Sequence, residues 1–180
     1  LSLSGASMTT MPNRRPMPPD VHQRLKEGVS RIRSGHLDDA EEIAEGLLRD
    51  YPTNPPGYNL LALVEEARGN LKGAAEAISR GLVHNPDAPA LLAMAIKLNL
   101  NRGQPEQAIK LAEQVKEGDA NWADVQWWKI LALERLHQLD EAADSLDQLP
   151  THGIRERLLS ARISRRRGQL EKARASLEEL

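Results

Sequence analysis

The side chains best suited to metal binding or acid-base catalysis are the histidines and several pairs of adjacent acidic residues. The histidines are His22, His36, His84, His137 and His152, and the acidic pairs are Asp38/Asp39, Glu41/Glu42 and Glu65/Glu66. The histidines are scattered, without the short spacing that brings two ligands to one metal ion. Adjacent residues on a helix point in different directions, so the acidic pairs are more typical of solvated helix surfaces than of a catalytic acid and base.

Other sequence signatures of chemistry are absent as well. The chain has no phosphate-binding glycine loop, no dinucleotide-binding motif, no H-E-x-x-H zinc motif and no calcium loop. It has no cysteine, which excludes disulfides and thiolate metal sites. The net charge is −2, whereas general nucleic-acid binding depends on an excess of lysine and arginine. We therefore expect no catalytic residue, no metal, no cofactor and no nucleic-acid partner.

A period of 34 residues organises the elements that must position any functional side chain. Residues that recur with this period are Gly35, Gly69 and Gly103, together with Ala40, Ala74, Ala108 and Ala142. His137 occupies the glycine position of the fourth unit, and Gly168 follows it after 31 residues. A fixed period of this length indicates stacked copies of one supersecondary unit, the last of them shortened near residues 149–153.

Each unit is predicted to form two antiparallel helices. Apolar residues recur at helical spacing in 58–64 and 91–100, and no segment alternates as a half-buried strand does. The recurrent alanine allows the two helices to approach closely. The glycines suit the left-handed residue that follows a helix, so we expect His137 to make its turn differently. Pro52 and Pro86 end second helices because proline lacks an amide donor, whereas Ala120 stands at that position in the third unit.

These landmarks resemble the tetratricopeptide repeat family, whose helix-turn-helix unit has the same length. The second unit carries the pattern best, with Tyr58, Leu61 and Ala62 in its first helix and Ala74, Ile78 and Pro86 in its second. The resemblance covers residues 21–180, in units 21–54, 55–88, 89–122, 123–153 and 154–180. It implies an all-α fold, a right-handed α-solenoid of antiparallel helix pairs with four full repeats and a fifth shortened one.

The family resemblance also implies where a ligand would bind, because the first helix of each tetratricopeptide pair lines a concave surface. The candidate groove residues at the corresponding positions are Asn59, Leu63, Ala93, Lys97, Asn101, Trp127, Leu131 and Arg135. The same positions of the fifth unit hold Arg155, Arg162, Arg165 and Arg166. Trp127 has two open interpretations, a ligand contact or the favoured packing role. Trp128 is expected in the core and Trp122 in the turn between units.

The chain ends differ from the repeat region. Residues 1–7 precede the first methionine and resemble a vector-derived remnant, and the proline-rich lead up to residue 20 is expected to be disordered. No secretion signal is recognisable, and the longest apolar run, 90–96, is far shorter than the roughly 20 residues of a membrane span. We therefore expect a cytoplasmic protein without a membrane partner. The helical pattern is unbroken at Leu180, so more protein is expected to follow.

Two functional hypotheses remain open. The favoured one is a non-catalytic interaction module that holds a protein or peptide segment in the concave groove, centred on Leu63, Lys97, Trp127, Leu131 and Arg135. Its partner would carry apolar and acidic side chains. The alternative is the N-terminal, substrate-recruiting repeat region of a larger bacterial enzyme of the sulfotransferase, glycosyltransferase or hydroxylase type. Homo-oligomerisation through the terminal helices is compatible with both hypotheses.

Overall fold

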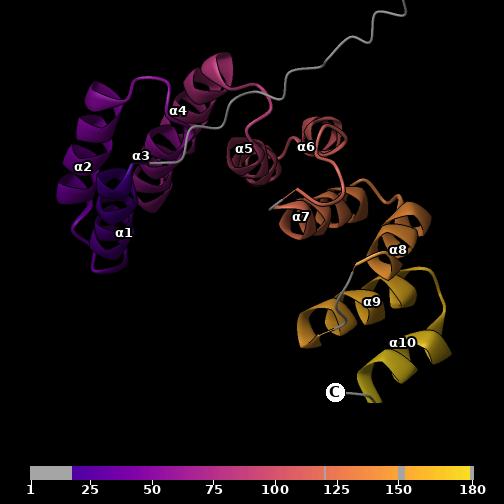
Figure 1. Ribbon diagram of the computed structural model, residues 1–180. Helices are drawn as coiled ribbons and strands as arrows, with labels where there is room; N and C mark the ends of the chain where they lie inside the picture. The colour runs from indigo at the N-terminus through magenta and orange to yellow at the C-terminus, as the bar shows by residue number, and fades with distance from the viewer. Residues whose placement is uncertain (1–17, 120, 150–152, 179–180) are drawn as a thin grey trace, which may run out of the picture.

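The computed structural model describes residues 18–119, 121–149 and 153–178, and within them the chain forms ten helices and no strand. The helices are α1 (Pro19–Arg33), α2 (Leu37–Asp50), α3 (Pro55–Ala67), α4 (Leu71–His84), α5 (Pro89–Asn101), α6 (Pro105–Ala112), α7 (Trp122–Arg135), α8 (Leu139–Asp147), α9 (Ile154–Arg166) and α10 (Leu170–Glu178). They form five pairs that follow one another along an all-α solenoid (Figure 1). The expected fold class is confirmed.

Proline marks the beginning of several helices. Pro19, Pro55, Pro89 and Pro105 all stand in the first turn, where the missing amide hydrogen costs no intrahelical bond. The second helices α2 and α4 have 14 residues each, whereas α6 has eight and α8 nine. The predicted closing position of the third unit, residue 120, and the centre of the shortened loop, residues 150–152, lie outside the described residues, as does the lead 1–17.

The turn inside every pair uses the same backbone conformation. Gly69 has a φ angle of 77°, and His137, the residue at the equivalent position, has a φ angle of 61°. The amide of His137 donates to the Glu134 carbonyl just as that of Gly69 donates to the Glu66 carbonyl. The expectation that His137 turns differently is therefore wrong. The helix end needs a left-handed residue to satisfy its last carbonyls, and this requirement overrides the steric preference of the side chain.

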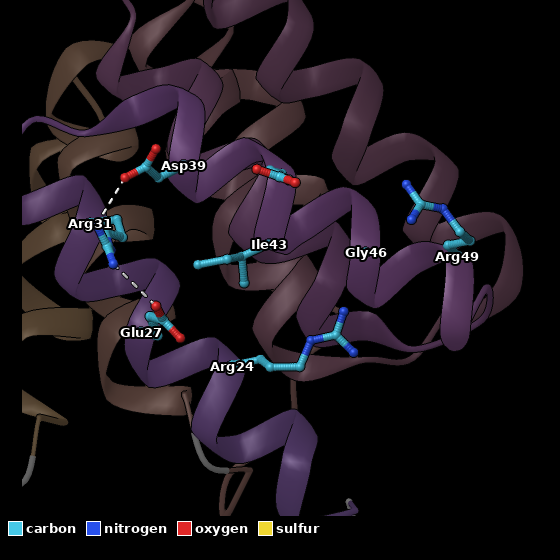
Figure 2. A pocket seen from close by; sticks show the side chains of 8 residues that line it. Arg24, Glu27, Arg31, Asp39, Ile43, Gly46 and Arg49 are labelled. Atoms are coloured by element: carbon cyan, nitrogen blue, oxygen red, sulfur yellow. Dashed lines mark hydrogen bonds and ion pairs between the residues drawn. The ribbon is translucent and has the colours of Figure 1, made fainter.

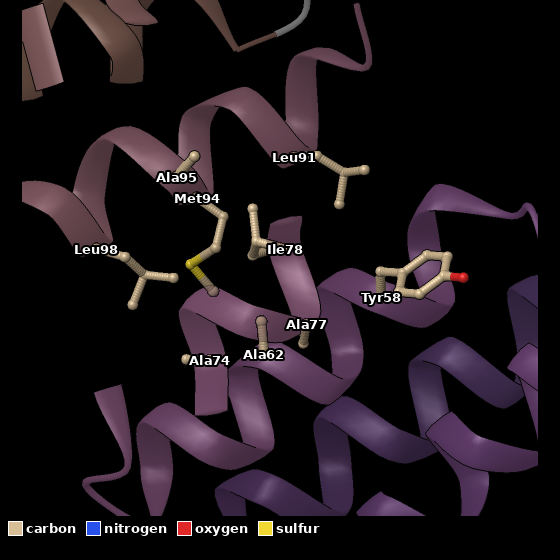
Figure 3. Close-up of a cluster of buried hydrophobic side chains, with 9 residues drawn as sticks. All are labelled: Tyr58, Ala62, Ala74, Ala77, Ile78, Leu91, Met94, Ala95 and Leu98. Atoms are coloured by element: carbon tan, nitrogen blue, oxygen red, sulfur yellow. The ribbon is translucent and has the colours of Figure 1, made fainter. Parts of the chain in front are cut away.

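The recurrent alanines bring the two helices of a pair together. Ala40, Ala74, Ala108 and Ala142 are all fully buried. Figure 3 shows the cluster around Ala74, where side chains from α3, α4 and α5 meet; its members are Tyr58, Ala62, Ala74, Ala77, Ile78, Leu91, Met94, Ala95 and Leu98. Each such cluster draws on more than one unit, so the core is continuous along the array and no pair buries its apolar face alone.

Two further clusters follow toward the C-terminal end. One joins α5, α6 and α7 and the other joins α7, α8 and α9. Trp128 is half-buried against the first, and Trp122 packs against both from the start of α7, as expected for residues that fill core and inter-unit space. No helix in the described part of the chain is long and apolar enough to cross a membrane.

Candidate functional site: the concave wall

The first helices form the inner wall of the solenoid. Helices α1, α3 and α5 each approach the next first helix closely, and α7 contacts α9 through side chains, whereas the described second helices do not approach one another in this way. An array of helix pairs curves toward the side on which its helices lie closer. The face of α3, α5, α7 and α9 is therefore the concave wall, which places the candidate groove residues on these helices (Figure 1).

The candidate residues differ in how freely a ligand could reach them. Asn59, Leu63, Ala93, Lys97, Trp127 and Leu131 are half-buried, and Asn101 and Arg135 are exposed. The side-chain oxygen of Asn59 is buried without a hydrogen-bond partner among the described residues. Leu63, Ala93 and Leu131 pack partly on the core clusters, so they present only an edge to the groove.

Lys97 and Arg135 are used inside the array. The Lys97 ammonium lies 2.7 Å from a carboxylate oxygen of Glu66, and the Arg135 guanidinium donates to the backbone carbonyl of Leu100. Each contact joins a first helix to the one before it. Lys97 and Arg135 therefore have a structural role at the inner positions that the family resemblance assigns to a ligand. A ligand would have to compete with Glu66 for Lys97 and with the Leu100 carbonyl for Arg135.

Trp127 packs inside the array and keeps part of its side chain exposed. Its indole packs partly against the α7–α9 cluster, which includes Ile130 and Leu159. The Arg155 guanidinium of α9 lies 3.6 Å from the centre of the ring. A cation at this distance is attracted by the negative face of the aromatic ring. Trp127 is thus a half-buried packing residue with an arginine guanidinium over its ring.

Glu134 occupies an inner position of the repeat register, where the family resemblance implied an exposed side chain, but it was left out of the candidate groove residues. Although buried, it accepts hydrogen bonds from Arg162 at 2.5 Å and from Arg166 at 3.1 Å. Arg166 also reaches the Glu134 carbonyl and the His137 ring. A buried carboxylate requires such pairing, because an unpaired buried charge is costly.

The repeat register could have revealed this ion pair. Lys97 follows its partner Glu66 by 31 residues, and Arg162 follows Glu134 by 28, which is the same step less the three residues missing from the shortened unit. The arginines that end first helices repeat in the same way. Arg68 follows Asp38 by 30 residues, and Arg167 bonds Asp140 at 2.6 Å in the corresponding place.

The acidic pairs act as ion-pair partners. Arg68 binds Asp38 at 2.6 Å and Glu41 at 2.7 Å, and hydrogen bonds to Glu41 and Asp38 raise the pKa of its guanidinium. Asp39 pairs with Arg31 at 2.9 Å. Among the described residues, no group of three or more histidine or acidic side chains has the arrangement of a metal site.

A separate cavity of about 480 Å³ lies between α1 and α2 at the N-terminal end. Figure 2 shows Arg31 between Glu27 and Asp39, with Ile43 pointing into the space. The lining carries both charges, and Arg24 pairs with Asp50 at 2.7 Å. The described outer face of the first pair is therefore mostly charged, with Ile43 as its apolar lining residue.

Comparison with known proteins agrees with this architecture. Residues 25–89 match a sequence model of the tetratricopeptide repeat. No curated protein sequence matches the chain. Among solved structures, MamA is 16% identical with a TM-score of 0.71, covering 84% of this chain and 90% of its own. The tetratricopeptide repeat protein TTC0263 of Thermus thermophilus is 20% identical with a TM-score of 0.67, covering 88% of this chain and 89% of its own.

A third similar structure is YrrB, a tetratricopeptide repeat protein with an unusual peptide-binding site. It is 17% identical with a TM-score of 0.66, covering 86% of this chain and 81% of its own. At such identities the likeness establishes the fold and says nothing about the ligand. Together with the sequence match, it shows that residues 25–89 are tetratricopeptide repeats and that the helix pairs beyond them continue the tetratricopeptide fold.

Proposed function

We propose that the protein is a non-catalytic interaction module that binds a peptide segment of another protein along its concave wall. The observation that carries this proposal is the half-buried Trp127 on the inner face, flanked by Leu131 and covered by the Arg155 guanidinium. Interfaces draw most of their affinity from a few aromatic or arginine anchors in partly enclosed places. The remaining groove residues, Asn59, Leu63, Ala93, Lys97 and Asn101, would line the path of the segment on either side.

The experiment is an unbiased peptide-display selection followed by affinity measurements. Peptides selected on the wild type are expected to lose about tenfold or more in affinity for Trp127→Ala, as hot-spot truncations do. The matched control is Val83→Ala, because Val83 is an apolar residue of α4 that is 79% exposed. Peptides that bind Trp127→Ala normally, or a selection without binders, would refute the concave site, provided that circular dichroism shows both variants to be folded.

We further propose that two copies associate through α10. Leu170 and Leu177 are 64% and 47% exposed, whereas Ile78, at the position equivalent to Leu177, is 1% exposed because the next first helix covers it. The opposite end of the array presents Arg24 and Arg31, which would lose hydration against these leucines. We therefore expect the α10 end of one copy to meet the α10 end of the other.

Light scattering across a range of concentrations tests this association. The wild type is expected to approach the mass of a dimer as concentration rises, and Leu177→Glu to remain monomeric. Val83→Glu introduces the same charge at an exposed position of α4 and is expected to behave as the wild type. A monomer at all concentrations, or a dimer that survives Leu177→Glu, would contradict the proposal.

A further inference from the structure

The net charge of the concave wall differs between its middle and its C-terminal end. The inner positions of α3 and α5 hold one basic residue, Lys97, and one acidic residue, Glu66, which pair with each other. The inner positions of α7 and α9 hold five basic residues, Arg135, Arg155, Arg162, Arg165 and Arg166, and two acidic ones, Asp124 and Glu134. The inner positions of α3 and α5 are therefore neutral in sum, and those of α7 and α9 have an excess of three positive charges.

The buried carboxylate of Glu134 does not neutralise the arginines around it. Glu134 accepts from both Arg162 and Arg166, so one negative charge serves two guanidiniums. Arg165 stands on the same stripe of α9 and is exposed. Arg155 has its guanidinium over the Trp127 ring, which leaves its N–H groups at the ring edge available for a hydrogen-bond acceptor.

The same place offers apolar surface. Leu158 is 49% exposed and lies on α9 one turn from Arg155, so the two side chains share a face. It occupies the position of the fifth unit that Trp127 occupies in the fourth. The backbones of α7 and α9 also lie farther apart than those of neighbouring first helices earlier in the array. A side chain of moderate size would therefore find apolar surface on Leu158 beside the arginine-covered Trp127 ring, with guanidiniums at its border.

From this juxtaposition we propose that the α7–α9 surface is the anchor site of the groove and that its ligand is an acidic peptide segment with a leucine or similar side chain between carboxylates. The apolar side chain packs on Leu158 and on the edge of the Trp127 indole, while Arg155 and Arg165 bind the flanking carboxylates. Guanidiniums hold carboxylates through paired, charge-assisted hydrogen bonds. This proposal rests on the concave-groove function and moves its centre away from Lys97, whose charge Glu66 already satisfies.

A protein segment fits this surface better than nucleic acid does. Nucleic-acid binding requires basic residues that follow a phosphate backbone, whereas here the excess of positive charge is confined to one end of a chain with a net charge of −2. The exposed Leu158 would gain nothing from a phosphate backbone. An apolar side chain flanked by acidic residues would use both properties of the site.

The test measures fluorescence anisotropy of a short labelled peptide in which leucines alternate with pairs of glutamates. A matched peptide carries lysine in place of glutamate. The acidic peptide is expected to bind, with affinity falling as salt rises because exposed charges are screened over about 8 Å at physiological ionic strength. Arg165→Glu and Leu158→Ser should each weaken binding about tenfold, as loss of an anchor does.

The matched control is Arg33→Glu, which makes the same charge change at an exposed inner position of α1, at the other end of the wall. It is expected to leave the affinity within about twofold of the wild type. Successive first helices pack roughly 10 Å apart, so the path from α1 to α9 spans several screening lengths. Circular dichroism of each variant establishes that it is folded.

The outcomes separate this proposal from the groove function. If Arg33→Glu weakens binding as much as Arg165→Glu, general charge attraction explains the binding and the α7–α9 site is wrong. If the acidic peptide fails to bind while display-selected peptides still depend on Trp127, the groove function stands and the acidic ligand is wrong. If no selected peptide depends on Trp127, both fail. Displacement of the acidic peptide by a single-stranded oligonucleotide, with the same dependence on Arg165, would identify nucleic acid as the occupant and overturn the proposal.

Discussion

The left-handed backbone of His137 is a local cost that the equivalent glycines of the other four turns avoid. For a residue with a Cβ atom this conformation is less favourable by about 1 to 2 kcal/mol. Part of this conformational cost is offset by a 3.1 Å contact between the His137 ring and an Arg166 guanidinium nitrogen. That contact links α9 to the turn between α7 and α8, so the departure from glycine coincides with the end of the array where arginines gather.

Replacing His137 by glycine tests this cost directly. We expect His137→Gly to raise the free energy of unfolding by up to about 1 kcal/mol, because relief of the strained φ angle outweighs the loss of an exposed contact. Urea denaturation provides the measurement. The control is Gly69→Ala, where nothing lies within 4 Å of the added Cβ, so its expected destabilisation comes from the backbone alone. A lower urea midpoint for His137→Gly would show that the Arg166 contact dominates.

Tyr51 offers a second test at the residue scale, because its hydroxyl donates to Asp20 at 3.0 Å. This hydrogen bond, followed by burial and the charge of Asp20, raises the pKa of the phenol. Asp20→Ala should therefore lower that pKa toward the ordinary value of about 10. Spectrophotometric titration of tyrosinate measures this pKa. Because the chain has two tyrosines, the Tyr51→Phe variant identifies the absorbance change that belongs to Tyr51. An unchanged titration would disprove the bond in solution.

The sign of the accompanying stability effect follows from the raised pKa. A phenol that holds its proton more tightly when folded contributes stability below its unfolded pKa, and this contribution is lost as pH rises through the folded value. The stability difference between wild type and Asp20→Ala should therefore be present at neutral pH and shrink in alkaline solution.

Among the elements, the helix pair depends on the small residue at its closest approach. Ala74 is fully buried among side chains of α3, α4 and α5, and the equivalent alanines of the other full units are buried too. The ion pairs on the inner wall connect one first helix to the next, as Glu66 and Lys97 do for α3 and α5. Close packing holds the two helices of a pair together, while packing and charge together hold neighbouring pairs.

Enlarging the buried alanine should disturb this packing. Ala74→Leu is expected to lower the free energy of unfolding by about 1 to 3 kcal/mol, because the added methyl groups have no space between the helices. Ala67→Leu makes the same change at the exposed end of α3 and is expected to be nearly neutral. Thermal unfolding of both variants provides the comparison, and equal stability of the two would remove the close-packing role.

For the whole molecule, stability is distributed along the array because each unit contacts only its neighbours. The central pairs are covered on both sides. In contrast, α10 leaves Leu170 and Leu177 exposed, and α1 and α2 end in a charged surface. The ends should therefore open locally at a lower free energy than the centre.

Amide hydrogen exchange measures this gradient. We expect amides of α10 to exchange faster than those of α4, its counterpart in the second unit, and amides of α1 to exchange faster than those of α3. The comparison is made below the concentration at which the chain associates, because burial of α10 in a dimer would protect it. Protection of α10 equal to that of α4 in the monomer would contradict the gradient.

The repeat could be predicted from the order of the amino acids, since glycine turns, buried alanines and helical apolar spacing are local requirements that recur with a fixed period. The same pattern placed Ala74 in the core, and the family resemblance implied that the first helices line the inner wall. It could not predict which inner side chains stay available to a ligand. Lys97 and Arg135 share a register with the proposed groove positions, but their partners, Glu66 and the Leu100 carbonyl, come from the preceding unit.

Those pairings and the surroundings of Trp127 emerge from the packing of the units in three dimensions. Sequence reasoning left Trp127 open because an indole at a boundary position satisfies both packing and binding, and the outcome depends on how closely α9 approaches α7. The guanidinium of Arg155, on α9, lies 3.6 Å from the centre of the Trp127 ring, so this contact depends on the placement of α9 against α7. Distances between units arise from the sum of packing along the array, which no local pattern encodes, and the proposed anchor site depends on those distances.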